Sequence, residues 1–170
     1  MKNTTLFKGN VVGLAGKFAT PGEEAPDFAL SKTDLSIFHL VDANGKRLLL
    51  NIFPSVDTPV CSRSVRRFNE IASQMENTLV LCVSKDLPFA QSRFCGAEGL
   101  KNVVMLSDFM YDSKFGKDYG ALMNDGPLRG LLARAVVIID STGRILYAEK
   151  SSDIVNEPDY QSALNILTNN

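Results

Sequence analysis

The chain has 170 residues and a mass of 18.6 kDa, which fits one domain, because a single hydrophobic core commonly serves about 100–200 residues. Its apolar fraction of 45% can fill such a core and excludes intrinsic disorder. The 18 Lys and Arg nearly balance the 19 Asp and Glu, so there is no global field to hold nucleic acid or an anionic membrane. We therefore expect a single domain over residues 1–170 that binds neither nucleic acid nor a membrane.

The cysteines and the first residues bear on the cellular compartment. Three cysteines are too few for a disulfide-stapled secreted scaffold, and an odd number leaves one unpaired. Glycines and Asn10 interrupt residues 1–20, whereas a secretory signal needs roughly 7–15 consecutive apolar residues. No apolar run approaches the ~20 residues that span a bilayer. These features predict a cytoplasmic protein.

The first part of the chain has the pattern of short strands. Apolar residues on both sides of Lys8-Gly9-Asn10 predict a β-hairpin, which we assign to an N-terminal extension of residues 1–20. Residues 21–26 form a loop with two prolines. Apolar residues at 28–30 and 38–40, followed by a turn at 42–45, predict further short strands.

A strand, a loop and a helix are predicted from Leu48 to about Met75. The nearly continuous apolar run Leu48–Phe53 is typical of a strand that is buried on both faces. Downstream, apolar residues recur at three- and four-residue steps, as in an amphipathic helix. A second apolar run, Leu79–Ser84, follows at the distance of a right-handed crossover, which makes the two strands parallel neighbours.

The second half continues the alternation of helices and strands. We expect a short helix from Pro88 to about Phe94, a third strand at residues 103–106 and a short helix at residues 115–120 that stops at a glycine. A hairpin at residues 135–150 and a final helix at residues 158–167, which begins at Pro158, complete the chain. This order predicts an α/β fold with a central mixed β-sheet flanked by helices. A thioredoxin-like architecture with an N-terminal β-hairpin fits, although periodicity does not fix the strand order.

Cys61 is the strongest candidate for chemistry. It lies in the segment PSVDTPVC, between a buried strand and an amphipathic helix. Asp57 or Thr58 can cap the helix and Pro59 suits its first position, so Cys61 falls in the opening turn. There the unpaired backbone N–H groups and the helix dipole favour a thiolate over a thiol. A fast reaction also needs a nearby hydroxyl, which Thr58 can supply, and a cation.

The remaining cysteines differ from Cys61, and other catalytic motifs are absent from the sequence. Cys95 sits beside a glycine at the end of a predicted short helix and could meet another thiol, whereas Cys82 lies in an apolar strand and is interpreted as core. The sequence has one histidine, His39, and no GxSxG, CxxC, P-loop or metal-ligand spacing. We therefore expect no metal and no cofactor.

Several segments together resemble the bacterial thiol peroxidases, an atypical two-cysteine branch of the peroxiredoxins. The resemblance runs nearly end to end and includes FKGN, GEEAPDFAL, NIFPSVDTPVCSRSVRRFNE with its PxxxTxxC pattern, SKDLPFAQSRFCGAEG, SDFMYDSKFGKDYG, GPLRGLLARAVVIID and EPDY. The PxxxTxxC pattern by itself would indicate only the wider superfamily. One departure is Arg129, where a small or neutral residue is usual; we interpret it as a solvated surface arginine.

The resemblance implies a role for each candidate residue. Cys61 corresponds to the peroxidatic cysteine and Cys95 to the resolving cysteine, while Pro54, Thr58 and Arg134 complete the peroxide pocket. The implied activity is reduction of hydrogen peroxide and organic hydroperoxides through a sulfenic acid on Cys61. Thr58 and Arg134 are expected to hydrogen-bond to the peroxide, and Pro54 to shield the thiolate from water.

The resemblance also implies the later steps and the partners. A Cys61–Cys95 disulfide would form and be reduced by thioredoxin, and the chain is expected to be a homodimer. Since a disulfide requires the two Cα atoms within roughly 7 Å, the two helical segments must loosen in each cycle unless they already lie that close. Two alternatives stay open: a thiol–disulfide oxidoreductase, and a redox-sensing module without peroxide turnover.

Overall fold

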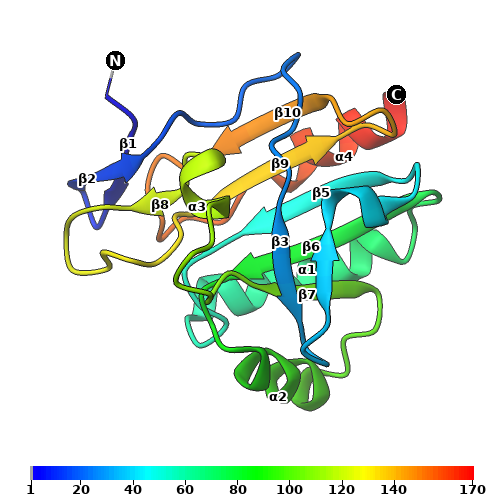
Figure 1. Ribbon diagram of the computed structural model, residues 1–170, viewed down its shortest axis with the longest axis horizontal. Coiled ribbons are helices and arrows are strands. Elements are labelled where there is room, and N and C mark those ends of the chain that lie inside the picture. The colour runs from blue at the N-terminus through cyan, green and yellow to red at the C-terminus, as the bar shows by residue number, and fades with distance from the viewer. Residues whose placement is uncertain (1) are drawn as a thin grey trace.

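A computed structural model describes residues 2–170 and shows a central sheet flanked by helices (Figure 1). Over these residues the central sheet has the strand order β10-β9-β5-β6-β7-β3-β4. The bounds of its strands, in chain order, are β3 Ala29–Lys32, β4 Ile37–His39, β5 Arg47–Ile52, β6 Thr78–Ser84, β7 Val103–Ser107, β9 Ala135–Ile139 and β10 Ile145–Lys150. A 3-10 turn, η1, covers Leu40–Ala43, and the helices are α1 Pro59–Ala72, α2 Pro88–Glu98, α3 Phe115–Asp118 and α4 Tyr160–Asn169.

The centre of the sheet consists of the strands with continuous apolar sequence. β5 pairs in parallel with β6, β6 pairs in parallel with β7, and β9 runs antiparallel to β5. All five residues of β9 are buried, as are the last five of β5 and of β6, because helices and loops cover both faces of these strands. The predicted mixed sheet and the parallel pair are confirmed.

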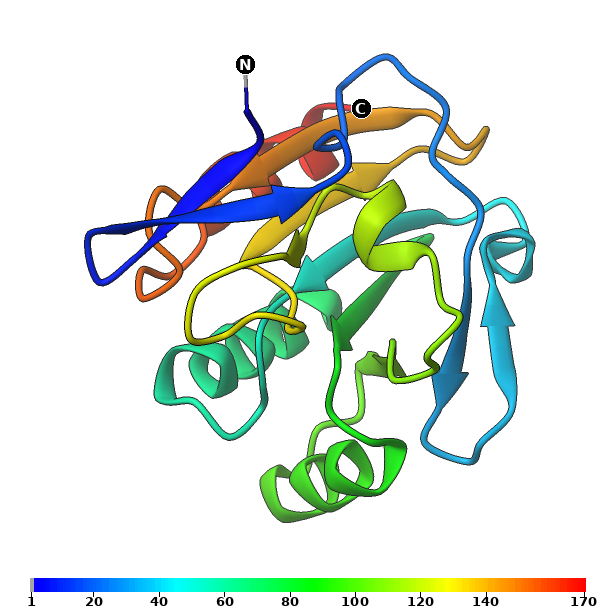
Figure 2. The ribbon, with the colours of Figure 1, turned by 60° about the vertical axis from the view of Figure 1, so that its left-hand side comes forward.

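The two faces of the sheet carry different cores. On one face α1 and α4 pack through residues such as Val65, Phe68 and Leu167, and the rings of Phe68 and Tyr160 meet edge to face. On the other face α3 and the chain before β3 bury Phe28, Phe115 and their neighbours (Figure 2). The carboxyl ends of β5, β6 and β7 lie at the same end of the sheet, since these strands are parallel.

The N-terminal hairpin forms a second, smaller sheet. Its strands, β1 Thr4–Phe7 and β2 Asn10–Ala15, are antiparallel and joined by Lys8 and Gly9, both with positive φ. β2 also pairs with β8, Leu122–Met123. The Leu6 N–H donates to the Ser152 carbonyl and the Leu6 carbonyl accepts from the Ile154 N–H, so this sheet is joined to the segment after β10. The predicted hairpin is confirmed, and its tip lies against the other end of the chain.

Three local features differ from the sequence-based expectation. α2 continues one turn past Phe94, because Gly96 is accommodated in the helix and Gly99, at φ 64°, is the residue that ends it. α4 begins at Tyr160 and not at Pro158, since Asp159 accepts a hydrogen bond from the N–H of Ser162 as its cap. The strand β8 was not expected. No helix of residues 2–170 combines the length and the apolar character needed to cross a membrane.

Candidate active site

The loop between β5 and α1 ends at Thr58, the N-cap residue of α1. Thr58 has an extended backbone, and its Oγ1 accepts a hydrogen bond from the Cys61 N–H at 3.3 Å. Pro59 occupies the first helical position, where its missing N–H costs nothing. Replacing such a cap by Ala usually costs about 1 kcal/mol, so the cap contributes to holding Cys61 in the first turn. Of the two candidate caps, the structure selects Thr58 over Asp57.

The Cys61 side chain is fully buried at the start of α1. It belongs to the core between α1 and the sheet, and its carbonyl accepts a hydrogen bond from Ser64 Oγ at 2.9 Å. Ser64 Oγ in turn lies 3.3 Å from Asn51 Nδ2 of β5, so the first turn of the helix is tied to the sheet. The sulfur is thus fixed in place and shielded from bulk water.

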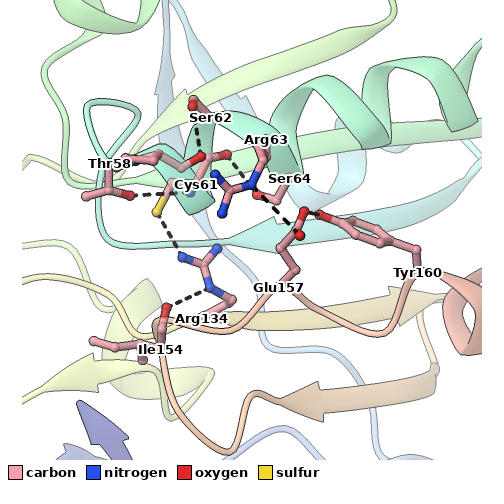
Figure 3. Close-up of polar contacts among 10 residues, drawn as sticks. Thr58, Cys61, Ser62, Arg63, Ser64, Arg134, Ile154, Glu157 and Tyr160 are labelled. Atoms are coloured by element: carbon pink, nitrogen blue, oxygen red, sulfur yellow. Dashed lines mark hydrogen bonds and ion pairs between the residues drawn. The ribbon is translucent and has the colours of Figure 1, made fainter. Parts of the chain in front are cut away.

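Arg134, the residue before β9, supplies the cation of the site (Figure 3). Its Nη2 donates to Cys61 Sγ at 3.2 Å, and its Nε donates to the carbonyl of Ile154 at 2.9 Å. The side chain is 1% exposed, and no carboxylate of residues 2–170 forms an ion pair with it. Because burying an unpaired charge costs several kcal/mol, this guanidinium favours an anion at the sulfur beside it.

One nitrogen of the Arg134 guanidinium takes no part in these hydrogen bonds. Its Nη1 is buried and has no hydrogen-bond partner among the described residues. Buried donors are normally satisfied, so an unsatisfied one beside a pocket is a place for an atom of a bound ligand. The side chain therefore holds the sulfur with one nitrogen while a second nitrogen remains available.

A pocket of about 310 Å³ adjoins the buried sulfur. Pro54, Thr58 and Arg134 line it, and the last two contact Cys61. Apart from Lys8, the remaining wall is apolar and consists of Phe7, Pro59, Val60, Leu128, Ile154 and Val155. Because the sulfur has no exposed surface, a neighbouring side chain has to move before a substrate in the pocket can reach it. The pocket is small and mostly apolar, with polar groups from Thr58, Arg134 and Lys8.

A second set of contacts supports α1 from the loop before α4. Glu157 accepts a hydrogen bond from the Tyr160 hydroxyl at 2.9 Å and lies 3.9 Å from Arg63 Nε (Figure 3). Both partners of the ion pair are about half exposed, so the pair by itself contributes at most about 1 kcal/mol. The same hydrogen bond helps raise the pKa of the Tyr160 hydroxyl above its usual value, after the larger effect of burial.

The other two cysteines lie in different surroundings. Cys95, in the last turns of α2, is half-buried and borders a separate cavity of about 240 Å³ with Lys32, Ser92 and Met105 among its walls. Burial raises the pKa of its thiol. Cys82 lies in β6, where burial raises the pKa of its thiol to about 12. All three cysteines are free thiols.

The structure brings together four of the five residues selected from the sequence. Thr58 and Arg134 contact Cys61 directly, and Pro54 lines the same pocket. Cys95 does not belong to this group: its cavity shares no lining residue with the pocket beside Cys61. Arg129 is exposed, as interpreted, and only its neighbour Leu128 reaches the pocket.

Sequence reasoning missed most of the apolar pocket wall. Phe7, Ile154 and Val155 come from the two ends of the chain and meet because the hairpin pairs with the segment after β10. No periodicity marks such residues. A weak signal was available, since Ile154 and Val155 are an apolar pair in an otherwise mostly polar loop.

The fold matches that of known proteins with solved structures. A peroxiredoxin-like protein from Aquifex aeolicus has a structure with a TM-score of 0.93 and 39% identity, covering 99% of this chain and 98% of its own. A thiol peroxidase from Chromobacterium violaceum gives 0.89 over 98% of this chain and 96% of its own, at 21% identity. The fold is therefore the thioredoxin-like fold of the peroxiredoxins.

The comparison of sequences is more specific. The Redoxin family model matches residues 20–164. The thiol peroxidase of Mycobacterium tuberculosis is 51% identical over 167 residues, which cover 98% of this chain and 99% of that protein. The thiol peroxidase of Corynebacterium glutamicum is 48% identical over 163 residues, covering 96% and 98%. The chain belongs to the Redoxin family, in its thiol peroxidase branch.

Proposed function

We propose that the chain is a thiol-dependent peroxidase in which Cys61 reduces hydroperoxides. The observation that carries this proposal is the contact of 3.2 Å between Cys61 Sγ and the buried Arg134, which forms no ion pair with a carboxylate of residues 2–170. The cation favours the thiolate, which is the nucleophilic form of cysteine. The similarity to thiol peroxidases over nearly the whole chain supports the same activity.

In the first step the Cys61 thiolate attacks the terminal oxygen of the hydroperoxide. An S–O bond forms while the O–O bond breaks, and the alkoxide or hydroxide that leaves takes up a proton to become an alcohol or water. The free Nη1 of Arg134 is the donor for the developing oxygen anion. Thr58 Oγ1 donates to the Ser55 carbonyl, so its remaining lone pair is better suited to accept the hydroperoxide O–H than to donate.

In the second step Cys95 attacks the sulfenic acid on Cys61. An S–S bond forms, the S–O bond breaks, and the hydroxyl leaves as water with the proton of the Cys95 thiol. Because Cys61 and Cys95 border different cavities, α2 and the first turn of α1 have to loosen before the sulfurs meet. This local unfolding is part of the proposed cycle.

In the third step a thioredoxin-type dithiol reduces the Cys61–Cys95 disulfide through a mixed disulfide. The dithiol is itself oxidised to a disulfide, and both cysteines return to thiols. We propose thioredoxin as this partner and the cytoplasm as the location, since a reducing compartment keeps the cycle supplied. The proposal needs no metal and no organic cofactor, because the electrons come from the two thiols.

We further propose a homodimer that buries apolar side chains beside the site. The segments that follow β6 and β7, including the start of α2, expose several large apolar residues at the end of the sheet where the Cys61 loop lies: Leu87, Phe89, Phe109, Met110 and Tyr111. Tyr111 is 100% exposed. Several large exposed apolar side chains at one end of a sheet favour an interface there.

The apolar wall of the pocket bears on the substrate. Hydrogen peroxide needs only the polar groups of Thr58 and Arg134. The organic part of an alkyl or lipid hydroperoxide also gains from contact with Phe7, Leu128 and Ile154. We propose that both are reduced, with organic hydroperoxides having the lower KM. Rates with hydrogen peroxide and cumene hydroperoxide, measured side by side, test this order.

The main test is hydroperoxide consumption with thioredoxin, thioredoxin reductase and NADPH. We expect Cys61→Ser to abolish turnover, whereas Cys95→Ser should consume about one hydroperoxide per chain and then stop. Activity retained in Cys61→Ser would place the nucleophile elsewhere. Turnover by Cys95→Ser at the wild-type rate would remove Cys95 from the cycle, and wild-type protein that exchanges disulfides without consuming peroxide would be an oxidoreductase instead.

A further inference from the structure

Asp86 lies between the two segments that carry the proposed reactive cysteines. It follows β6, two residues before α2 begins, and β6 ends beside β5, from which the Cys61 loop leaves. Its carboxylate accepts three hydrogen bonds: from Ser55 Oγ at 2.7 Å, from the Val56 N–H at 2.9 Å and from Ser84 Oγ at 2.6 Å. Two of the three donors thus belong to the loop that leads to Cys61.

The same network continues into the helix of Cys95. Ser84 Oγ, which donates to Asp86, accepts a hydrogen bond from Gln91 Nε2 at 3.1 Å. Gln91 is fully buried on α2, one turn before Cys95, and its Nε2 also donates to the Leu106 carbonyl at 2.9 Å. A continuous chain of polar contacts therefore runs from α2 through β6 to the Cys61 loop.

This hydrogen-bond network helps to hold α2 on the sheet, because the helix has few buried residues. Its fully buried residues are Pro88 and Gln91, while Phe94 and Cys95 pack half-buried against the core on the α1 side, and the helix has no side-chain cap at its N-terminus. Because the buried face supplies most of the free energy that holds a helix on a sheet, and Gln91 is the polar residue of this small face, its hydrogen bonds are a substantial part of that hold. The Ser107 hydroxyl also donates to the Asp86 carbonyl, which fixes the turn before α2.

We propose that Asp86, Ser84 and Gln91 form a clasp that positions the Cys61 loop for peroxide reduction and couples its release to loosening of α2. The inference rests on the proposed function, in which Cys61 and Cys95 form a disulfide. Asp86 is a positioning residue in this scheme: it orders Ser55 and Val56, and through them Thr58, whose hydroxyl donates to the Ser55 carbonyl. Loss of Gln91 from the clasp frees α2 while the loop stays held.

The clasp separates two rates that can be measured in one experiment. Reduced protein is mixed with cumene hydroperoxide, quenched at low pH, alkylated and examined by intact mass, which reports Cys61 oxidation and disulfide formation separately. We expect Asp86→Ala to slow Cys61 oxidation by about tenfold or more and to speed disulfide formation, since it removes three bonds to a charged acceptor. We expect Gln91→Met to speed disulfide formation alone.

Asp86→Asn distinguishes geometry from charge. The amide oxygen can accept from the Val56 N–H and Ser84 Oγ, and the amide nitrogen can donate to Ser55 Oγ, so every contact is kept without the negative charge. We expect this variant to restore both rates to near wild type, with an unchanged pH profile of Cys61 oxidation. If Asp86→Asn is as slow as Asp86→Ala, the carboxylate acts by charge and the positioning role is wrong.

Two controls exclude simpler explanations. Asp57→Asn removes another carboxylate of the same loop, one that is 69% exposed and paired with Arg93, and should change neither rate. Ile145→Ala destabilises the fold from the far end of β10, and should not alter the ratio of the two rates. If Ile145→Ala changes the ratio of the two rates as much as Asp86→Ala does, then Asp86→Ala acts only through global stability and the clasp is overturned.

The outcomes also separate the clasp from the proposed function. Wild-type protein that neither consumes hydroperoxide nor forms the disulfide contradicts the proposed function. Wild-type protein that does both, with an Asp86→Ala variant that matches it in both rates, contradicts the clasp alone. If Asp86→Ala does not fold, Ser55→Ala removes one of the three bonds, and unchanged Cys61 oxidation in that variant is the contradicting result.

Discussion

The two helices that carry Cys61 and Cys95 are built in opposite ways. α1 buries Val65, Phe68 and Ile71 along one face, is capped by Thr58 and is supported by Tyr160 from α4. α2 projects from the edge of the sheet, buries little and contains a glycine next to Cys95 (Figure 2). One thiol is therefore held in a prepared environment and the other sits on an element that is inexpensive to unfold.

The difference teaches how two demands on one small fold are divided. A nucleophile needs fixed donors around it, because stabilisation of developing charge depends on groups that are already in place. A thiol that must travel needs a segment with few buried contacts, since such segments open locally at a small fraction of the global free energy of unfolding. In the proposed cycle the two demands fall on successive helices, α1 and α2.

The largest effect is expected from the fixed side of this comparison. Arg134→Met keeps the length and apolar part of the side chain but removes the donors to Cys61 and to the pocket. We expect the second-order rate constant of Cys61 oxidation to fall about 10²- to 10³-fold, as when one oxyanion donor is removed elsewhere. Stopped-flow or quenched-flow kinetics with hydrogen peroxide measures it, and circular dichroism checks the fold. An unchanged rate constant would contradict the role of Arg134.

A smaller effect, on the mobile side, is expected from a pair of exposed neighbours in α2. Gly96→Ala should stabilise the helix, because nothing lies within 4 Å of the added methyl group, and Ala97→Gly should loosen it. At about 1 kcal/mol for each exchange, disulfide formation should become roughly fivefold slower in the first variant and faster in the second. Cys61 oxidation should stay the same in both. Equal rates in the two variants would mean that α2 does not unfold in the step.

The smallest effect on peroxide turnover, none at all, is expected at Cys82, which takes no part in the proposed cycle and whose influence falls on stability. Burial raises the pKa of Cys82 to about 12 from an ordinary 9.0, so the folded chain keeps a proton that the unfolded chain loses. Stability should therefore be fully present below about pH 9 and fall above it, by up to about 1.4 kcal/mol per pH unit from this group. Cys82→Ala should flatten the decline between pH 9 and 10.5 in denaturant titrations. An equally steep decline in that variant would assign it to other groups, such as Tyr119, whose pKa burial also raises.

The sequence predicted what local pattern can determine. The buried strands β5 and β6 were evident because burial on both faces leaves an unbroken apolar run, and α1 was evident from its spacing. The strand order and the two-residue strand β8 depend on pairing between distant segments, which periodicity does not report. α2 extends one turn beyond the predicted end at about Phe94, because a helix end has no clear signal in the residues Cys95–Glu98.

The site divides in the same way. Thr58 and Cys61 share one turn of helix, so their relation was visible in the residues themselves. Arg134 lies 73 positions from Cys61 and was selected through the family resemblance. Asp86 and Gln91 escaped notice, because single polar residues in turns and on helices have no pattern until the fold shows what they contact.

The hairpin β1–β2 lies outside the stretch shared with the Redoxin family, which begins at residue 20, yet Phe7 and Lys8 form part of the pocket wall. The proposed reacting groups thus come from the common module, while one side of the pocket wall comes from an appendage. Substitutions in that appendage are therefore expected to change which hydroperoxides are admitted without disturbing the reacting groups.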